Sequence, residues 1–193
     1  MITYRSIQEN DLPVLTELYS KYLNSGEYIS QSTRTAFERG EYAGCAAELD
    51  GQIAGFMTLR AGIVLTYPHE ELEDELNTAA GGQRVWCCDA LLVLPEYRIH
   101  GISHELARRC AKQLVEMGVS CFLAEIWIYP DGRSPAKRIF ESMGHVTFQK
   151  KVPMFYRDQS LYGITCPFCG EHCVCGAWLE LIALQDGDGP RDS

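Results

Sequence analysis

The sequence predicts an α/β (α+β) fold, in which apolar strands alternate with amphipathic helices in one main domain. Residues 90–94 form an apolar run that ends at Pro95, and apolar residues recur at helical spacing from Ser103 onward. This pattern predicts a strand, a turn and a helix. Asp50-Gly51 separates two further apolar stretches and indicates a β-hairpin. At 193 residues, 46% of them hydrophobic, the chain is long enough for one core of ordinary size.

The other elements follow from the same patterns. Further strands are expected at 2–5, 46–49, 53–59, 120–129, 146–150 and 153–156, and further helices from Pro13, at 32–39 and at 135–143. Residues 69–76 are acidic, with leucines spaced for a short surface helix. A solvated charge run is favoured there over a role in attracting a cationic substrate. Residues 178–184 are expected to return as a strand on the sheet or to pair with a second subunit.

The turn at residues 98–103 is a candidate anion-binding site. The first amides of a helix lack intrahelical partners and lie at the positive end of its dipole, so they bind phosphate and similar groups. Gly101 allows a ligand to approach the backbone closely, Ser103 can cap the helix or donate its hydroxyl, and Arg98 can add a charge-assisted contact. On spacing alone, an ordinary strand-to-helix turn with an exposed arginine fits equally well.

This turn and a second motif resemble those of the GCN5-related N-acetyltransferases, the GNAT family. The first motif is Val93-x-Pro95-Glu96-Tyr97-Arg98-x-x-Gly101-x-Ser103, which resembles the family's acetyl-CoA loop, Arg/Gln-x-x-Gly-x-Gly/Ala. Residues 134–145 resemble the second motif, of the form Asn…Ala-x-x-x-Tyr-x-x-x-Gly-Phe, with Ser134, Phe140 and His145 in place of Asn, Tyr and Phe. The resemblance covers residues 2–156 and implies a mixed, mostly antiparallel sheet flanked by helices.

The resemblance also implies a site for acetyl-CoA beside the strand at 90–94. Backbone groups of that strand pair with the pantetheine arm in the family, and the following turn holds the pyrophosphate. The residues implied in cofactor binding are Leu91, Leu92, Val93, Arg98, Ile99, His100, Gly101, Ile102, Ser103, His104, Ser134 and Phe140.

The reaction that the resemblance implies is N-acetyl transfer, in which a primary amine of a small molecule or protein attacks the thioester directly. Amines with a pKa of about 10 are protonated at neutral pH, so a base must accept a proton. Asp89 lies four residues before Val93, where several family members carry a catalytic carboxylate; an aspartate that caps a backbone group is an equal alternative. Glu125 is the reserve base, with an ordinary exposed strand residue as its simpler interpretation.

Phe140 lacks the hydroxyl that would protonate the leaving thiolate. Tyr129 is assigned this role, with Tyr156 or a water as alternatives, and a thiolate with a pKa of about 8.5 can also leave unprotonated. Ser134 and Phe140 support a second function, that of a non-catalytic CoA-binding or protein-interaction member of the family.

A cysteine cluster near the C-terminus is the second chemical feature. Its residues are Cys166, Cys169, Cys173 and Cys175, and Cys-x-x-Cys-Gly is a knuckle pattern that points two thiolates at one metal ion. Four soft ligands favour structural zinc, with His172 able to replace one cysteine, whereas the spacing matches no common iron–sulfur pattern. Reduced cysteines in an ordinary hairpin are the alternative. The expected organisation is an acetyltransferase domain at 1–160, a zinc-binding extension at 161–184 and a disordered tail at 185–193.

The chain is acidic: 17 Lys and Arg against 26 Asp and Glu give a formal charge of −9. This charge excludes general nucleic-acid binding and suits a cationic acceptor such as a polyamine or a lysine side chain. No signal peptide and no apolar run of about 20 residues appears, so we expect a cytoplasmic protein without a membrane partner. An odd number of cysteines, nine, favours reduced thiols. Homodimers are common in the family, so a homodimer is one expected assembly.

Overall fold

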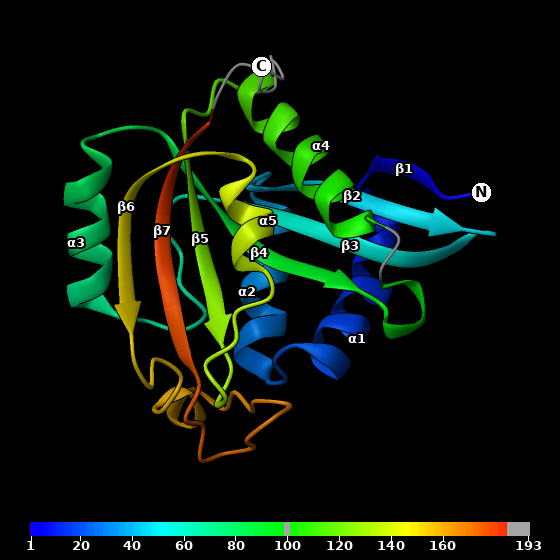
Figure 1. Ribbon diagram of the computed structural model, residues 1–193. Helices are drawn as coiled ribbons and strands as arrows, with labels where there is room; N and C mark the ends of the chain where they lie inside the picture. Colours follow the sequence, from blue (N-terminus) through cyan, green and yellow to red (C-terminus); the bar gives the residue numbers. More distant parts are fainter. Residues whose placement is uncertain (99–100, 185–193) are drawn as a thin grey trace.

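The computed structural model describes residues 1–98 and 101–184 and organises them around one sheet (Figure 1). Its seven strands run in the order β1-β2-β3-β4-β5-β7-β6, and every neighbouring pair is antiparallel except β4 with β5. The strands are β1 (Thr3–Ser6), β2 (Tyr42–Leu49), β3 (Gln52–Ala61), β4 (Val85–Val93), β5 (Cys121–Ile128), β6 (Gly144–Val152) and β7 (Gly176–Leu184). The mixed, mostly antiparallel sheet is therefore confirmed. The expected tail at 185–193 lies outside the described residues.

Helices flank both faces of this sheet. They are α1 (Leu12–Tyr22), α2 (Glu27–Glu38), α3 (Glu70–Ala80), α4 (Ile102–Glu116) and α5 (Lys137–Glu141). On one face, Leu106 of α4 and Phe140 of α5 belong to the same apolar cluster as Met57 and Phe122. On the opposite face, Leu15 of α1 packs near Phe56, the neighbour of Met57 in β3. One face is thus covered by α4 and α5, and the other by α1, α2 and α3 (Figure 1).

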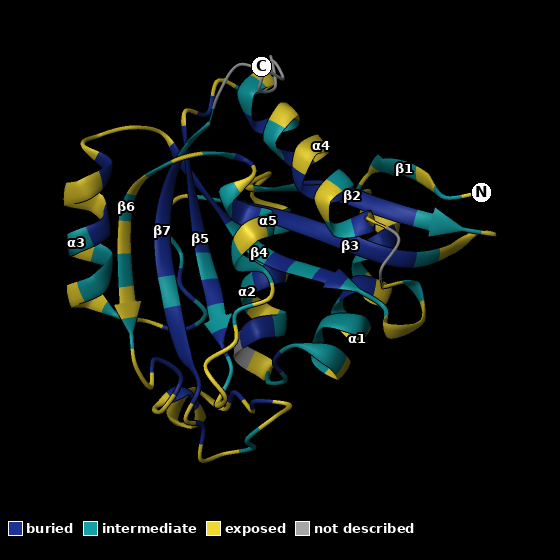
Figure 2. Ribbon diagram, viewed as in Figure 1, coloured by how far each residue is buried: buried dark blue, intermediate teal, exposed yellow. Residues whose placement is uncertain are grey.

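The hairpin between β2 and β3 has the turn that its sequence predicts. Asp50 and Gly51 adopt φ angles of 53° and 80°. Positive φ at both central residues is the geometry whose twist matches antiparallel strands, and Asp-Gly tolerates it. Exposed residues gather on the outer helix surfaces, while the inner strands are largely buried (Figure 2). The longest helix of the described residues, α4, has 15 residues. No helix in this part of the chain is long and apolar enough to cross a bilayer.

Two elements differ from the sequence-based expectations, whereas the acidic segment forms the short helix that its leucine spacing predicts. The second helix begins at Glu27 and not at residue 32. Gly26, just before it, has a φ of 149° and brings the preceding turn against Gly163, and this turn sets the start of the helix. A Cβ on Gly26 would lie 2.4 Å from the carbonyl oxygen of Gly163. The strand expected at 153–156 is wrong: the chain turns there, with Met154 at φ 52°. The acidic segment forms α3, whose Leu76 is buried while most of its acidic residues face solvent.

β7 lies inside the sheet, between β5 and β6. Its pairing with β5 runs from Gly176 to Ala183, and its pairing with β6 runs from Ala177 to Leu184. Residues 161–184, expected to form an extension, therefore complete the main sheet through this strand. The cysteine cluster belongs to the connection between β6 and β7, residues 153–175, which lies beyond the carboxyl end of β5 (Figure 1).

Candidate active site

The central strands of the sheet separate and open a cleft. β4 pairs with β5 only from Val85 to Cys87. From Cys88 onward, β4 has no strand partner on its β5 edge among the described residues. Asp89 is the extra residue of a bulge in β4, since Thr58 faces Ala90 while Leu59 faces Cys88. A bulge bends its strand and redirects a side chain. The resulting cleft has a volume of about 1000 Å³, including open solvent at its mouth.

One wall of the cleft carries the residues assigned to cofactor binding. Leu91, Leu92 and Val93 pair with β3 on one edge only, so their other backbone groups are available to a ligand. Leu91 lines the cleft itself, as does Phe140, which is buried against Phe122 with ring centroids 6.0 Å apart. Ser134 donates its hydroxyl to the carbonyl of Trp127 at 2.9 Å, so its side chain braces the end of β5.

The turn that precedes α4 leaves the start of the helix without a side-chain cap. Gly101 is the N-cap of α4, with φ 71°, and Ser103 lies in the first turn of the helix. Ile102 buries its side chain in the core, whereas His104 is exposed. The exposed Arg98 donates from Nε to the Val93 carbonyl at 3.1 Å, which fixes the start of the turn. Ile99 and His100, also assigned to this site, lie outside the described residues.

Glu125 is held by three hydrogen bonds inside the cleft. The backbone N–H of Thr66 donates to Oε2 at 2.9 Å and the Thr66 hydroxyl to Oε1 at 2.5 Å. The Tyr156 hydroxyl donates to Oε1 at 2.7 Å. Burial raises the pKa of Glu125 above its ordinary value, although the hydrogen bonds from Thr66 and Tyr156 oppose the rise. A carboxylate with a raised pKa is better matched to accept a proton near neutral pH.

Asp89 forms a buried ion pair with Arg60. Oδ1 accepts from the Arg60 guanidinium, and Oδ2 accepts from the Thr58 hydroxyl at 3.4 Å. Burial raises the pKa of Asp89, and the charge of Arg60 opposes the rise. Arg60 is itself braced by the hydroxyls of Ser32 and Thr33. Asp89 therefore lines the cleft as one half of an ion pair, whereas Glu125 has only neutral donors.

Tyr129 lies at the end of β5 and lines the same cleft. Its side chain is half-buried, and burial raises the pKa of its hydroxyl, which keeps the phenol protonated at neutral pH. The cleft thus gathers all three residues assigned to catalysis, Asp89, Glu125 and Tyr129.

Two residues escaped the sequence analysis: Thr66, which donates twice to Glu125, and Arg60, which pairs with Asp89. Thr66 lies 59 residues before Glu125, in a connection without regular structure, so no periodicity indicates it. Arg60 offers a weak signal, because it is a charged residue in an otherwise apolar strand. A buried charge in such a strand requires a partner, and an acidic residue in the next strand is the natural candidate.

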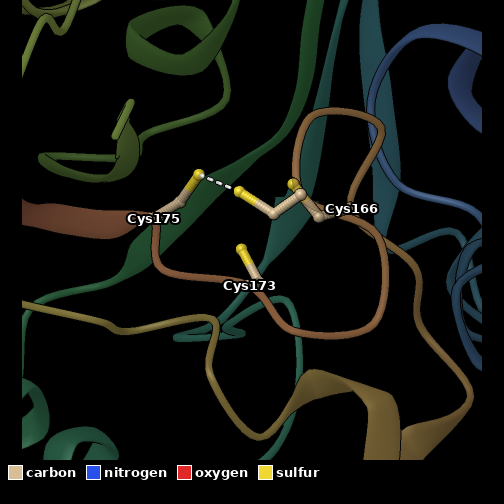
Figure 3. A group of neighbouring side chains, drawn as sticks. Cys166, Cys173 and Cys175 are labelled. Carbon is tan, nitrogen blue, oxygen red and sulfur yellow. Dashed lines mark hydrogen bonds between the residues drawn. The ribbon is translucent and has the colours of Figure 1, made fainter. Parts of the chain in front are cut away.

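The four cysteines of the cluster converge on one point. Their sulfur atoms all lie within 4.8 Å of one another, and those of Cys169 and Cys175 are 3.7 Å apart. Figure 3 shows Cys166, Cys173 and Cys175 directed toward a common centre. Metal–sulfur bonds of about 2.3 Å in a tetrahedron place sulfur atoms about 3.8 Å apart, so this donor set fits zinc.

The backbone of the cluster also suits thiolates. Gly170, with φ 70°, closes a tight turn in which its N–H donates to the Cys166 carbonyl at 2.9 Å. The backbone N–H of Val174 donates to the Cys169 sulfur and lowers the pKa of that thiol. Amides directed at sulfur are the arrangement that the Cys-x-x-Cys-Gly pattern predicts.

Comparison with known proteins assigns the fold. The model of the acetyltransferase (GNAT) family matches residues 12–145. NAA60 of Arabidopsis thaliana in complex with acetyl-CoA is similar in structure, with a TM-score of 0.64, 18% identity, and coverage of 95% of this chain and 98% of that one. The ribosomal-protein-S18-alanine N-acetyltransferase of Escherichia coli gives a TM-score of 0.60 at 16% identity, covering 100% and 99% of the two chains.

The acetyltransferase yncA of Salmonella typhimurium, solved with acetyl-CoA, gives a TM-score of 0.59 at 15% identity, covering 100% of this chain and 99% of that one. At these identities the structural likenesses show the fold alone. A search of curated proteins finds no match. The family model spans more than half of the chain and includes the open edge of β4, the turn before α4 and Glu125. The chain therefore belongs to the GNAT family of acetyltransferases.

Proposed function

We propose that this protein is an N-acetyltransferase that moves the acetyl group of acetyl-CoA to a primary amine by direct attack in a ternary complex. The observation that carries the proposal is the position of Glu125, a half-buried carboxylate held by neutral donors in the same cleft as the unpaired edge of β4. One cleft thus offers a place for the thioester and a base for the amine.

Acetyl-CoA lies along β4 in this proposal. The backbone groups of Leu91 and the backbone N–H of Val93 pair with the pantetheine amides, and the first amides of α4 after Gly101 hold the pyrophosphate. Arg98 adds a positive charge at the phosphate end. The thioester then lies between the bulge at Asp89 and the end of β5, near Tyr129.

Glu125 accepts the proton that the amine must lose. The protonated amine transfers a proton to the carboxylate, directly or through a water, and the nitrogen lone pair attacks the thioester carbonyl. The carbon–sulfur bond breaks, the electron pair leaves with the sulfur, and the new amide nitrogen loses its second proton to water. Tyr129 donates its proton to the departing thiolate, since its raised pKa keeps the hydroxyl protonated until that step. Glu125, the cleft carboxylate that pairs with no arginine among the described residues, favours a cationic acceptor, whereas the charge of Asp89 is balanced by Arg60.

The acceptor is a small amine or a protein amino group. Two structural neighbours support a protein acceptor by their descriptions: the S18-alanine N-acetyltransferase named above, and the NatC complex bound to Gag peptide and CoA, similar with a TM-score of 0.63 at 15% identity. The net charge of −9 suits a cationic acceptor of either kind, a small amine or a protein amino group.

The cysteine cluster binds structural zinc in this proposal. Cys166, Cys169, Cys173 and Cys175 would supply four thiolates, and a closed tetrahedral site of this kind holds chain segments together. Reduced thiols and a thiolate-bound metal suit a reducing compartment, so we propose a cytoplasmic location. Assembly as a homodimer stays a prediction.

The test is the steady-state release of free CoA from acetyl-CoA in the presence of polyamines, aminoglycosides, amino acids, lysine peptides and peptides with free N-termini. Turnover with one amine class, lost in Glu125→Gln, supports the proposal. Tight binding of acetyl-CoA without turnover on any amine would instead favour a non-catalytic CoA-binding protein, the function that Ser134 and Phe140 support.

A further inference from the structure

We propose that a metal ion bound by Cys166, Cys169, Cys173 and Cys175 positions the acceptor side of the cleft, so that metal loading controls acceptor binding while acetyl-CoA binding stays unchanged. The inference rests on the proposed function, because it assigns the two walls of the cleft to the two substrates. It goes beyond a structural zinc site by giving the metal a defined effect on one substrate.

Phe168 provides the first link between the cluster and the cleft. This residue lies between Cys166 and Cys169, and its side chain is 57% exposed. Its ring nevertheless contacts Trp127 and Tyr129, with centroids 5.5 Å and 4.8 Å apart, and both of these residues line the cleft. Burial alone does not hold so exposed a ring in place, whereas metal ligands on either side of it fix its backbone.

Tyr156 provides the second link. Its backbone N–H donates to the Cys175 carbonyl at 3.3 Å, and its hydroxyl donates to Glu125 at 2.7 Å. Cys175 directly precedes β7, whose first residue, Gly176, pairs with Ile128 at the end of β5. A ligand of the metal is therefore one hydrogen-bonded residue away from the proposed base.

Thr165 provides the third link, to the connection between α1 and α2. Thr165 directly precedes the first metal ligand, Cys166. It exchanges two backbone hydrogen bonds with Ser25, at 2.8 Å and 3.2 Å. Asn24, the residue before Ser25, lines the cleft. Its buried Oδ1 has no hydrogen-bond partner among the described residues. A buried polar atom without a partner, in a residue that lines the cleft, is a candidate to accept an N–H of the acceptor.

The connection that carries these links needs a crosslink. Residues 153–175 contain one short 3-10 helix and no strand of the sheet, and they carry most of the exposed large apolar side chains, including Met154, Leu161 and Val174. Long connections without regular structure are uncommon in compact domains, and metal binding couples directly to the folding of such segments.

On the opposite wall of the cleft, α4 is packed independently of the cluster, whereas Val85 and Cys87 at the start of β4 share the core of the cluster. α4 belongs to an apolar core with Met57, Trp86 and Phe122, whereas Cys166, Cys173 and Cys175 belong to the separate core on the other face of the sheet. Removal of the metal should therefore leave the acetyl-CoA wall intact.

The test compares the zinc-loaded protein with the same protein after chelation, with zinc content measured on both. Hydrogen exchange is followed in residues 125–129, 153–175 and α4, and acetyl-CoA affinity is measured by calorimetry. We expect about one zinc ion per chain. Chelation should speed exchange in the first two segments and leave α4 protected, with the acetyl-CoA Kd changed less than about twofold. Restored zinc should reverse these changes.

Chelation should also raise the acceptor KM about tenfold, with a smaller effect on kcat. Phe168→Ala, which removes the ring but no ligand, should raise the acceptor KM while zinc content stays unchanged. Leu161→Ala, which shortens an exposed side chain in the same connection, should change neither the acceptor KM nor the zinc content. A folded protein that retains no zinc overturns the proposal, as does exchange that chelation leaves unchanged or acetyl-CoA binding that weakens in parallel. Exchange and zinc content need no acceptor, so they decide the inference even if no amine is acetylated.

Discussion

The two walls of the cleft are built in different ways. Most of the acetyl-CoA wall is one continuous stretch of chain, in which β4, the turn at Gly101 and the start of α4 follow one another within residues 85–104, and Phe140 of α5 adds to it. The acceptor wall is assembled from distant segments: Thr66 lies 59 residues before Glu125, and Tyr156 lies 31 residues after it. The contrast teaches that a wall built mainly from one local stretch can be recognised from sequence patterns, whereas a wall assembled from distant segments depends on tertiary packing.

Electrostatic construction differs as well. The acetyl-CoA wall offers backbone amides and Arg98, which suit a polyanion, whereas the acceptor wall offers the half-buried carboxyl group of Glu125. Asp89 lies at the junction, with its charge balanced by Arg60. The predictions below separate these contributions.

Glu125→Gln should have the largest effect. Loss of the base should lower kcat/KM for the amine by about 1000-fold, within the usual range for general base catalysis. The acetyl-CoA Kd should stay unchanged, because Glu125 belongs to the acceptor wall. Steady-state kinetics and calorimetry measure the two effects. Glu116→Gln, at an exposed residue of α4, is the matched control and should leave both parameters unaltered. Equal loss in the two variants would remove Glu125 from the mechanism.

The pH dependence of the activity should follow the ionisation of Glu125. Burial raises the folded-state pKa of Glu125 above its ordinary value of 4.5, and only the ionised carboxylate accepts a proton. Activity should therefore be complete above the raised pKa and fall tenfold per pH unit below it. With two amines of different pKa, the acidic limb should stay at one pH while the alkaline limb moves. An acidic limb that shifts with the amine would contradict the assignment.

Arg60→Met should destabilise the fold by about 3 kcal/mol, because it leaves the Asp89 carboxylate buried without its partner. The double variant Arg60→Met with Asp89→Asn should recover most of this loss. Urea unfolding measures both. Arg108→Met removes an exposed pair with Glu105 and should cost less than about 1 kcal/mol. Similar losses in Arg60→Met and Arg108→Met would show that the Arg60 pair contributes no more than a surface contact.

Arg98→Ala should weaken acetyl-CoA binding by about tenfold, the value of one charge-assisted contact at a partly solvated site. The loss should shrink at high salt, and the acceptor KM at saturating acetyl-CoA should not change. Titration calorimetry at two ionic strengths measures the effect. Arg39→Ala carries the same charge change on the exposed end of α2 and serves as the control. A loss that is the same in both variants would mean that net charge, and not the turn, attracts the cofactor.

Phe140→Tyr should have the smallest effect, less than about threefold in kcat. Phe140 lines the cleft but is buried against Phe122, and Tyr129 already supplies a hydroxyl at the end of β5. A clear rise in kcat, measured by CoA release, would show that the missing tyrosine at residue 140 limits the reaction and would transfer the acid role away from Tyr129.

The sequence indicated the acetyl-CoA wall well. Strand, turn and helix were each recognisable from apolar periodicity, Pro95 and Gly101, because these signals act over a few residues. The acceptor wall was only partly predictable. Glu125 appeared as a reserve base, but nothing local revealed that Thr66 and Tyr156 would bind its carboxylate. The bulge that turns Asp89 into the cleft was also missed, since bulges depend on the register of the neighbouring strand.

The sequence by itself therefore determined most of the strands and helices, the turn before α4 and the cysteine spacing, all of which depend on neighbours within a few residues. Only the tertiary structure decided that β7 enters the sheet between β5 and β6, which carries the cysteine cluster to the end of β5. It also decided which carboxylate is paired with arginine and which is held by neutral donors. Such choices depend on the packing of segments far apart in the chain, and no local pattern of residues records them.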